Sequence, residues 1–124
     1  MGEQAVATTL DDVAVAALSG DSLRTRSLMQ DWISGNTNLE MHLPPVTQDP
    51  TTRSLTAALA ELMAQRLGQN PPPWTAGIGA APHPTHLLRS ALSMKRLRDE
   101  CERSAPDPLR RRLFYAPANY LEML

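Results

Sequence analysis

Hydrophobic residues recur three or four positions apart in two short segments near the start of the chain. The first segment, residues 10–18, follows Thr9, and Asp12 three positions later completes a weakened capping box. The second segment follows Asp21, an acid that can cap a helix, and ends at Gly35. The two segments therefore predict an αα-hairpin of antiparallel helices.

The third predicted helix, residues 50–67, has the clearest helical period in the sequence. A capping acid, Asp49, precedes a proline in the first helical position, and Gly68 marks the end. The apolar stripe comprises Leu55, Ala58, Leu59, Leu62, Met63 and Leu67. The polar residues expected opposite it are Glu61, Gln65 and Arg66. We expect this helix to lie at the centre of the core.

Prolines interrupt the helical pattern on both sides of this helix. Residues 36–50 have no helical period and predict an irregular connection. Residues 69–84 contain five prolines and two glycines, which forbids a regular helix or an interior strand. We expect Trp74 and Ile78 to hold this proline-rich internal loop against the helices.

A fourth helix is predicted after the proline-rich loop. It begins at Thr85 or at Ser90 and ends near Arg103, and the state of residues 85–92 stays open. A further capping signal predicts one short helical turn over residues 106–112.

The last residues mix two tendencies. Residues 113–115 are the only segment with strand character, and so short a strand cannot form a sheet alone. Residues 118–124 predict a terminal helical turn.

Composition favours an all-α fold. The chain of 124 residues is 42% hydrophobic but only 4% aromatic, so its core is built from Leu, Ala and Met, which are good helix formers. Val and Ile are scarce, which argues against a large sheet. We predict one domain over residues 1–124: four to five helices in a small bundle with a proline-rich irregular segment, and a frayed start over residues 1–8.

The lone cysteine and the hydropathy bear on the compartment. Cys101 excludes an intramolecular disulfide, which suits a reducing compartment. No apolar run approaches the roughly 20 residues of a membrane span, and no leader opens the chain. We expect a cytoplasmic protein without a membrane partner.

Charge is distributed unevenly although the net charge is −1. Residues 89–112 carry eight basic and four acidic residues, whereas the rest of the chain carries four basic and nine acidic residues. This asymmetry suits self-association or a basic face for an acidic partner, and it also suits an ordinary solvated helix face.

Candidate catalytic and metal-binding residues do not form a recognisable set. The histidines His42, His83 and His86 and the single Cys101 lack the paired motifs of structural zinc sites. Cys101 falls on the apolar stripe of the fourth helix, where cysteine behaves as a small buried hydrophobe. We therefore predict a protein that is not an enzyme, with no catalytic, cofactor-binding or metal-binding residues.

The C-terminal segment combines arginines with aromatic residues, the types that dominate protein-binding hot spots. The candidate partner-binding residues are Arg110, Arg111, Arg112, Phe114, Tyr115 and Tyr120. The aromatic residues have an alternative use as the few large packing units of the core. Among them we expect Trp74 to face inward and Tyr120 to be exposed.

Nucleic-acid binding is the alternative for the same arginines. Arg24 and Arg26 follow a tight turn into the second helix, the position of a recognition helix in DNA-binding proteins. The alternative nucleic-acid-binding set is therefore Arg24, Arg26, Arg110, Arg111 and Arg112. A pI of about 6.3 argues against it.

Three motifs in the second half resemble a group of small uncharacterised bacterial proteins. They are Leu67-Gly68-x-x-Pro71-Pro72-x-Trp74-Thr75, Leu97-Arg98-x-x-Cys101-Glu102-x-x-x-Pro106 and Leu109-Arg110-x-Arg112-x-Phe114-x-x-Pro117-x-x-Tyr120-Leu121. Some members of that group carry an amino-terminal helix-turn-helix, and others look like antitoxin partners of nucleotidyltransferase-like toxins. The resemblance covers residues 55–121 and implies no catalytic residues. We do not expect residues 1–54, which precede the shared region, to form a separate DNA-binding domain.

These observations favour a non-enzymatic protein-binding module of the antitoxin or accessory kind, which binds a partner protein. The alternatives are a small DNA- or RNA-binding transcriptional regulator and a structural subunit that forms a homodimer or larger homo-oligomer.

Overall fold

Helices dominate the computed structural model, which describes residues 8–35 and 38–122 and is 59% helical. These ranges contain the α-helices α1 (Leu10–Leu18), α2 (Ser22–Gly35), α3 (Pro50–Leu67), α4 (Lys95–Ser104) and α5 (Asp107–Arg110). They also contain the short 3₁₀ helices η1 (Leu39–Met41), η2 (Pro73–Gly77) and η3 (Arg89–Leu92) and the strands β1 (Thr85–His86) and β2 (Phe114–Tyr115). The prediction of a small all-α fold is confirmed. The predicted fraying of residues 1–8 concerns a segment of which only Thr8 is described.

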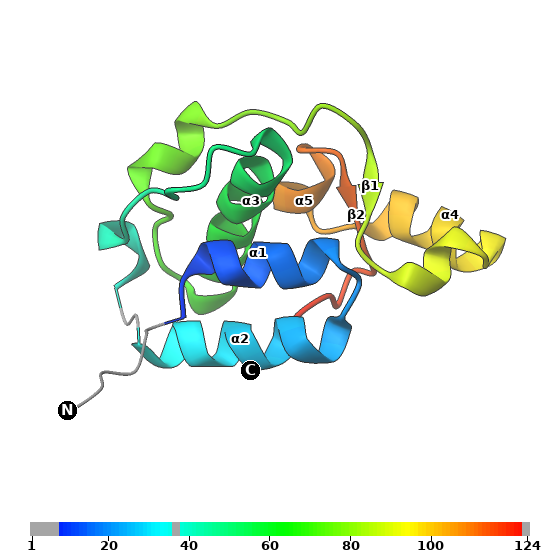
Figure 1. Ribbon diagram of the computed structural model, residues 1–124, viewed down its shortest axis with the longest axis horizontal. Coiled ribbons are helices and arrows are strands. Elements are labelled where there is room, and N and C mark those ends of the chain that lie inside the picture. The colour runs from blue at the N-terminus through cyan, green and yellow to red at the C-terminus, as the bar shows by residue number, and fades with distance from the viewer. Residues whose placement is uncertain (1–7, 36–37, 123–124) are drawn as a thin grey trace.

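Helices α1 and α2 form the predicted hairpin. The Thr9 hydroxyl accepts a hydrogen bond from the Asp12 N–H, and the Asp12 carboxylate accepts one from the Thr9 N–H, both at 3.1 Å. Asp21 caps α2 by accepting from the Arg24 N–H at 3.0 Å. The two helices lie side by side and run in opposite directions (Figure 1). Local capping chemistry thus sets where both helices begin.

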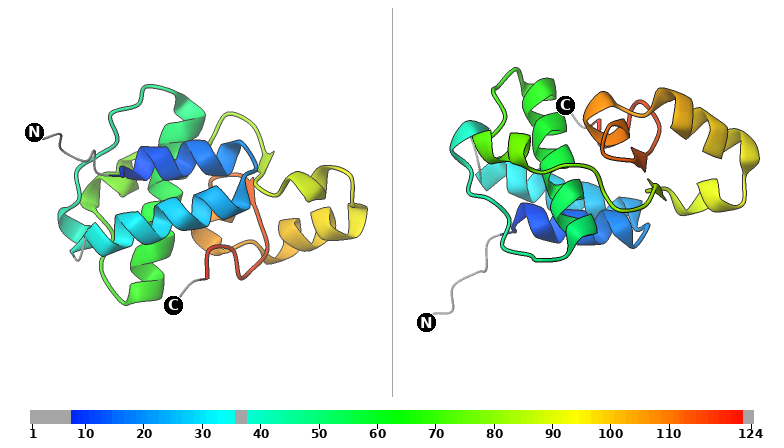
Figure 2. Two further views of the ribbon diagram at one scale, coloured as in Figure 1. Left: turned by 60° about the horizontal axis from the view of Figure 1, so that its bottom comes forward. Right: turned by 90° about the horizontal axis from the view of Figure 1, so that it is seen from above.

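Helix α3 lies in the middle of the fold, as predicted. The Asp49 carboxylate accepts from the Thr52 N–H at 2.9 Å, and Gly68 ends the helix at φ 68°, a left-handed conformation that glycine adopts without strain. Its buried residues lie on almost every side of the helix rather than on one stripe. Helices α1 and α2 cover one side of α3, and the C-terminal third of the chain covers another (Figure 2).

The proline-rich loop is irregular, as predicted, apart from the single turn of η2. Trp74 and Ile78 do attach it to the rest of the molecule. The Trp74 indole N–H donates to the His42 carbonyl at 2.8 Å, and the Ile78 carbonyl accepts from the Arg112 guanidinium at 3.0 Å. The Ser54 hydroxyl on α3 adds a hydrogen bond of 2.9 Å to the Gly79 carbonyl.

The prediction that the fourth helix begins at Thr85 or Ser90 is wrong, because α4 begins only at Lys95. Thr85 and His86 instead form β1, which pairs in parallel with Phe114 and Tyr115 of β2. The Leu87 N–H continues this pairing by donating to the Tyr115 carbonyl at 2.9 Å. Backbone hydrogen bonds to a distant segment therefore override the local helical tendency of residues 85–87, whereas residues 89–92 form the short 3₁₀ helix η3.

The chain end follows the sequence-based expectation only in part. The predicted short turn exists as α5, and Leu113 at φ 71° reverses the chain into β2. Residues 118–121 form a turn rather than the predicted helical turn, and residues 123–124 lie outside the described part of the chain.

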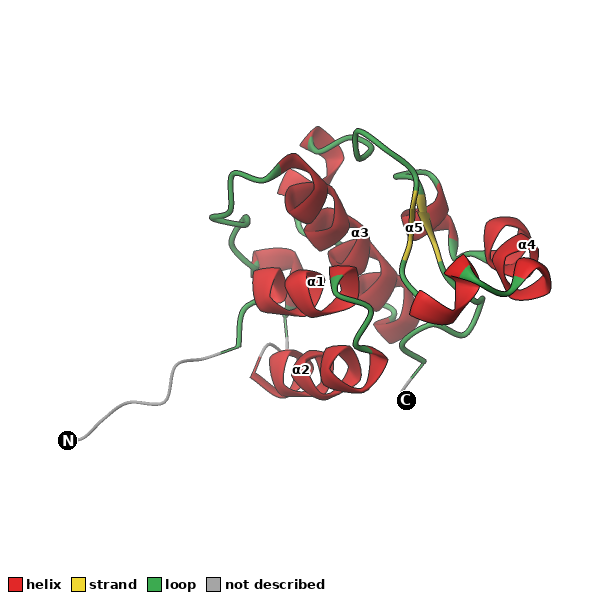
Figure 3. Cartoon of the chain, turned by 45° about the vertical axis from the view of Figure 1, so that its right-hand side comes forward, coloured by secondary structure: helices red, strands yellow, loops and turns green. Residues whose placement is uncertain are grey.

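Residues 88–104, which comprise η3 and α4, stand out from the helical body; we call them the arm. The arm extends to the right of Figure 1, away from α1, α2 and α3, and Figure 3 shows the same separation from another side. Its base is fixed where the Arg89 guanidinium donates to the Ser19 carbonyl in the α1–α2 turn.

Candidate protein-binding surfaces

Arg112, a predicted partner-binding residue, is buried inside the fold. Its guanidinium donates to both carboxylate oxygens of Glu61 on α3 and to the Thr75 carbonyl at 2.9 Å. Arg111 reaches the same carboxylate from the surface. Because α5, α3 and the proline-rich loop meet at this pair, Arg112 serves as an internal tie and does not present its charge to a partner.

Glu61 was predicted on the polar face of α3, but its side chain is only 11% exposed. Burial by itself raises the pKa of the Glu61 carboxyl, and hydrogen bonds from Arg112 and Arg111 lower it. The net pKa lies below the ordinary value, so Glu61 is ionised at neutral pH. The carboxylate and the Arg112 guanidinium form a largely buried ion pair, whose loss on one side leaves an uncompensated charge.

The aromatic residues predicted for partner binding belong mostly to the core. Phe114 is fully buried, and Tyr115 is half-buried with its ring 5.3 Å from that of His86. Tyr120 is also buried, so the prediction that it is exposed is wrong. Burial raises the pKa of the Tyr120 phenol well above its ordinary value. Trp74 is partly buried and packs against the core, in line with its predicted inward orientation.

The arginines of the nucleic-acid alternative do not form one free cluster. Arg26 donates to the Glu122 carbonyl at 3.1 Å, whereas Arg111 and Arg112 bind Glu61. Arg24 and Arg110 are exposed. Since α2 lies antiparallel to α1 and buries Met29 and Trp32, this helix pair lacks the crossed arrangement of a helix-turn-helix.

The first surface that remains available to a partner is the tip of the arm, residues 92–96. Leu92 and Met94 are 66% and 54% exposed, far more than most large apolar residues of the chain. Lys95 and Arg96 follow directly, and Arg98 donates to the Leu92 carbonyl at 3.3 Å. Residues 88–98 carry four basic residues and no acidic one. The arm tip thus combines apolar contact area with positive charge.

The second surface surrounds residues 39–47, which we call the strap; it connects α2 to α3. The Asp11 carboxylate on α1 accepts from the backbone N–H groups of Val46 and Thr47, each at 3.2 Å. Gln69 accepts from the Leu39 N–H at 2.9 Å. The strap is therefore attached to both neighbouring parts of the fold, which the sequence pattern of an irregular connection did not predict.

His42 is the central attachment of the strap. The indole N–H of Trp32 donates to the His42 Nε2 at 3.3 Å, and that of Trp74 donates to the His42 carbonyl at 2.8 Å. The Trp32 and His42 rings meet edge to face at 4.9 Å. Burial lowers the pKa of His42, and the charge of Asp11 opposes that shift only in part. A neutral imidazole is required here because Nε2 accepts a hydrogen bond.

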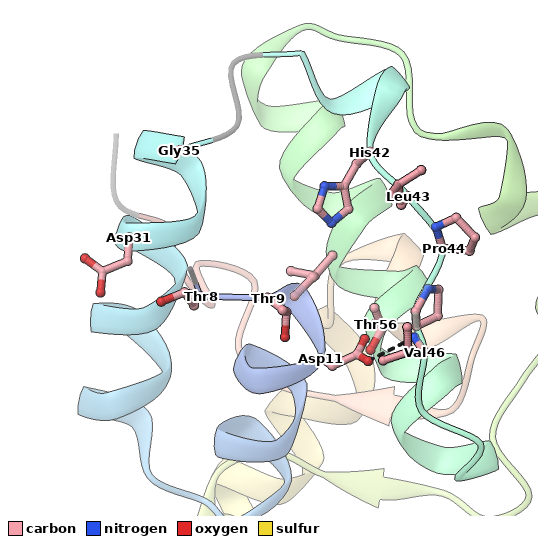
Figure 4. A pocket seen from close by; sticks show the side chains of 12 residues that line it. Thr8, Thr9, Asp11, Asp31, Gly35, His42, Leu43, Pro44, Val46 and Thr56 are labelled. Atoms are coloured by element: carbon pink, nitrogen blue, oxygen red, sulfur yellow. Dashed lines mark hydrogen bonds between the residues drawn. The ribbon is translucent and has the colours of Figure 1, made fainter. Parts of the chain in front are cut away.

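A pocket of about 450 Å³ opens between the strap, the start of α1 and the end of α2 (Figure 4). Its wall is mainly apolar, and Leu43, Pro44 and Val46 of the strap supply much of it. Leu43 and Val46 are 77% and 84% exposed. Asp11 contributes a carboxylate, and Asp31 also lines the pocket, although Figure 4 shows its carboxylate directed to the outer side of α2. The pocket therefore offers apolar contacts beside negative charge.

The remaining candidates from the sequence do not gather into a chemical site. The His86 Nε2 lies 2.9 Å from a Glu102 carboxylate oxygen, and His83 is exposed elsewhere on the loop. Cys101 is buried, and burial raises the pKa of its thiol, which opposes thiolate formation. Within residues 8–35 and 38–122, no three His, Cys, Asp or Glu side chains are grouped so that they could hold a metal ion.

No family model, no curated protein and no solved structure matches the chain. Among the described residues, no helix is both long and apolar enough to cross a membrane. What the fold and its surfaces define is a small all-α protein with two separate exposed apolar surfaces of opposite charge character, the arm tip and the strap pocket.

Sequence reasoning missed the strap pocket, and it placed Arg112, Phe114 and Tyr120 on a binding surface although their side chains are buried. The sequence did contain one indication of the pocket. Large apolar residues stand around two prolines, outside any helical period, in Met41-His42-Leu43-Pro44-Pro45-Val46. Because these residues do not form the buried face of a helix, several of them are exposed, and an exposed group of large apolar residues indicates an interaction surface. The burial of Arg112 had no comparable signal, because Glu61 is 51 residues away along the chain.

Proposed function

We propose that this chain is a non-enzymatic protein-binding module of the antitoxin or accessory kind, and that it binds a partner protein through the arm tip. The observation that carries the proposal is the exposure of Leu92 and Met94 next to Lys95 and Arg96 on an element that stands away from the body. Methionine and arginine are enriched in protein interfaces, and arginine is among the residues that most often dominate the binding energy.

The character of the arm tip suits a protein partner better than a nucleic acid. Phosphate-backbone binding depends on several free cations in one groove. Here Lys95 pairs with Asp99 at 2.9 Å, and Arg89 is bound to the α1–α2 turn. Arg96 is exposed and has no ion pair or hydrogen bond within the described chain. One free arginine beside two apolar residues matches an acidic protein surface with an apolar centre.

The resemblance of residues 55–121 to antitoxin-like proteins suggests which class of protein the partner belongs to. In this structure the shared motifs build the scaffold of the arm: Arg112 and Phe114 are buried, and β2 holds β1 at the base of the arm. We therefore infer that the motifs keep the arm in position, while residues between them contact the partner. A nucleotidyltransferase-like toxin is the partner class that the resemblance suggests.

Co-expression with the product of the adjacent gene tests the proposal. We expect the two proteins to co-elute in size-exclusion chromatography, and Met94→Asp to weaken the complex at least tenfold, since a carboxylate replaces an apolar contact facing an acidic partner. Leu23→Asp is the matched control, because Leu23 is 80% exposed on α2, outside both surfaces. If Met94→Asp binds as tightly as the wild type, or if no complex with that gene product forms, the arm tip is not the partner-binding surface.

Titration with duplex DNA and with single-stranded RNA separates the nucleic-acid alternative. Binding that falls steeply with salt, and that is lost in Arg24→Ala but kept in Met94→Asp, supports a regulator instead.

A further inference from the structure

The strap pocket has the shape and the surroundings of a docking site that nothing in the described chain fills. Its volume of about 450 Å³ is within the range of well-formed protein pockets. Leu43 and Val46 stay exposed at its wall although the strap is attached to the body by Asp11 and His42. When a segment is held against the body by hydrogen bonds and its large apolar side chains are still exposed to solvent, those side chains indicate a surface that another molecule covers.

Charge indicates what kind of side chains suit this pocket. Residues 8–47, which include α1, α2 and the strap, carry five acidic and two basic residues. Of the acids, Asp31 lines the pocket, directs its carboxylate to the outer side of α2 beside it, and makes no hydrogen bond or ion pair within the described chain. Asp11 keeps its carboxylate at the inner side, where the backbone N–H groups of Val46 and Thr47 donate to it. An occupant with an apolar tip and flanking positive charge is complementary to this arrangement.

The arm tip of this same chain has that composition. Met94 is unbranched and flexible, which suits an irregular apolar pocket. Leu92 stands beside it, and Lys95 and Arg96 follow within two residues. The free guanidinium of Arg96 can pair with a carboxylate such as that of Asp31 in a bidentate way.

The two surfaces lie at opposite ends of one molecule. In Figure 1 the arm extends on the right, whereas the start of α1, the end of α2 and the strap lie on the left. The views in Figure 2 show the same separation. An arm therefore cannot reach its own pocket, and contact between the two surfaces has to join different copies.

We infer that the arm tip of one copy docks into the strap pocket of a second copy, so that the chain associates head to tail. The inference rests on the proposed function, because it names a second partner for the same arm. A contact between two different surfaces is heterologous and does not close in a dimer. Each added copy presents a new free arm and a new free pocket, so association continues into longer chains or a ring. A toxin-like partner that occupies the arm ends this growth.

Sedimentation velocity of the purified wild-type chain over a range of concentrations is the first test. We expect the weight-average sedimentation coefficient to rise with concentration past the dimer value, and to fall when ionic strength increases from about 0.05 to 0.5 M, because charges at the edge of the contact are screened. A chain that stays monomeric at several hundred micromolar, or that stops at a dimer, overturns the inference.

Complementary variants give the decisive test. Met94→Asp disables the arm, and Leu43→Lys disables the pocket by setting a positive charge against an incoming basic arm. Both positions are exposed, so folding should be unaffected, and circular dichroism checks this. We expect each variant alone to be monomeric, whereas an equimolar mixture forms a dimer and nothing larger, since it contains one intact arm and one intact pocket per pair. Leu23→Asp and Leu23→Lys are the matched controls and should associate like the wild type.

The outcomes also separate this inference from the proposed function. Leu43→Lys should lose self-association and keep the complex with the adjacent gene product, whereas Met94→Asp should lose both. A monomeric mixture of the two variants overturns the head-to-tail contact even when the partner complex forms normally. Head-to-tail association without any partner complex overturns the proposed function instead.

Discussion

Arg110, Arg111 and Arg112 are adjacent in the chain and differ in burial and in partners. Arg112 is buried against Glu61 and two backbone carbonyls, Arg111 reaches Glu61 from the surface, and Arg110 is 3.7 Å from exposed Asp107. Arg110 ends the short helix α5, and Arg111 and Arg112 follow it in the turn toward β2. The residue type alone therefore does not show which of the three arginines is buried.

Single replacements of these arginines should therefore differ in their effect on stability. We expect Arg112→Ala to lower the free energy of unfolding by about 3–5 kcal/mol, because it leaves the Glu61 carboxylate without its buried partner. Arg111→Ala should cost about 0–1 kcal/mol, as an exposed ion pair does. Arg110→Ala should be indistinguishable from the wild type. Urea denaturation at pH 7 measures all three, and equal losses would contradict the assigned roles.

His42 should make stability depend on pH. Its folded pKa is lowered by burial, so the fold favours the neutral imidazole that accepts from Trp32. The contribution of His42 to the free energy of unfolding is fully present above the unfolded pKa of about 6.5. It declines as pH falls below that value, because His42 is protonated more readily in the unfolded chain than in the folded one.

Nuclear magnetic resonance titration of the His42 ring should give a midpoint below about 6.5. We also expect the near-ultraviolet signal of the tryptophans to change when His42 is protonated in the folded state. His42→Gln removes the titrating group, so the tryptophan signal of this variant should stay constant over the same pH range. A midpoint at or above the ordinary value would contradict the geometry.

At the scale of elements, the helices that carry their own capping residues begin and end where the sequence predicts. Thr9, Asp21 and Asp49 each accept a backbone hydrogen bond from the first turn of the helix they precede. By contrast α4 has no side-chain cap, and its start was predicted at least five residues too early. A boundary encoded by a neighbouring capping residue is predictable, whereas the start of α4, which has no such residue, is not.

The central position of α3 is an element-scale prediction that mutation can test. Leu62 is almost fully buried, so Leu62→Ala should lower the free energy of unfolding by about 2–5 kcal/mol through lost burial and the cavity left behind. Gln65→Ala, on the exposed side of the same helix, is the control and should change stability by less than about 0.5 kcal/mol. Chemical denaturation of both variants measures the difference. A loss below about 0.5 kcal/mol for Leu62→Ala would show that α3 does not form the core.

At the scale of the whole molecule, the C-terminal segment completes the core. Phe114, Ala116, Tyr120 and Leu121 are buried among residues of α1, α2 and α3. Arg66 on α3 further binds the Tyr120 carbonyl, and at 3.2 Å the Ala118 carbonyl. Residues 114–121 therefore belong to the folded unit and do not form an appended binding tail.

Truncation after Leu113 should consequently unfold the protein rather than leave a folded body without its binding segment. It removes several buried side chains and the strand that pairs with β1, and a domain of this size has little stability to spare. We expect the truncated chain to lose most of its helical circular dichroism and its cooperative thermal transition. A truncated protein that keeps both would show that the C-terminal segment lies outside the core.

The sequence by itself determined the helical class, the start of three helices, the central helix and the proline-rich interruption. Each of these depends on residues within a few positions of one another, through helical periodicity, capping and the fixed backbone of proline. The tertiary structure alone decided which arginine is buried, why residues 85–86 are extended, and where the strap pocket opens. Those features arise from contacts between residues tens of positions apart, such as Arg112 with Glu61 and Trp32 and Trp74 with His42. The free energy of such contacts is realised only once the helices have packed, so no local pattern encodes it.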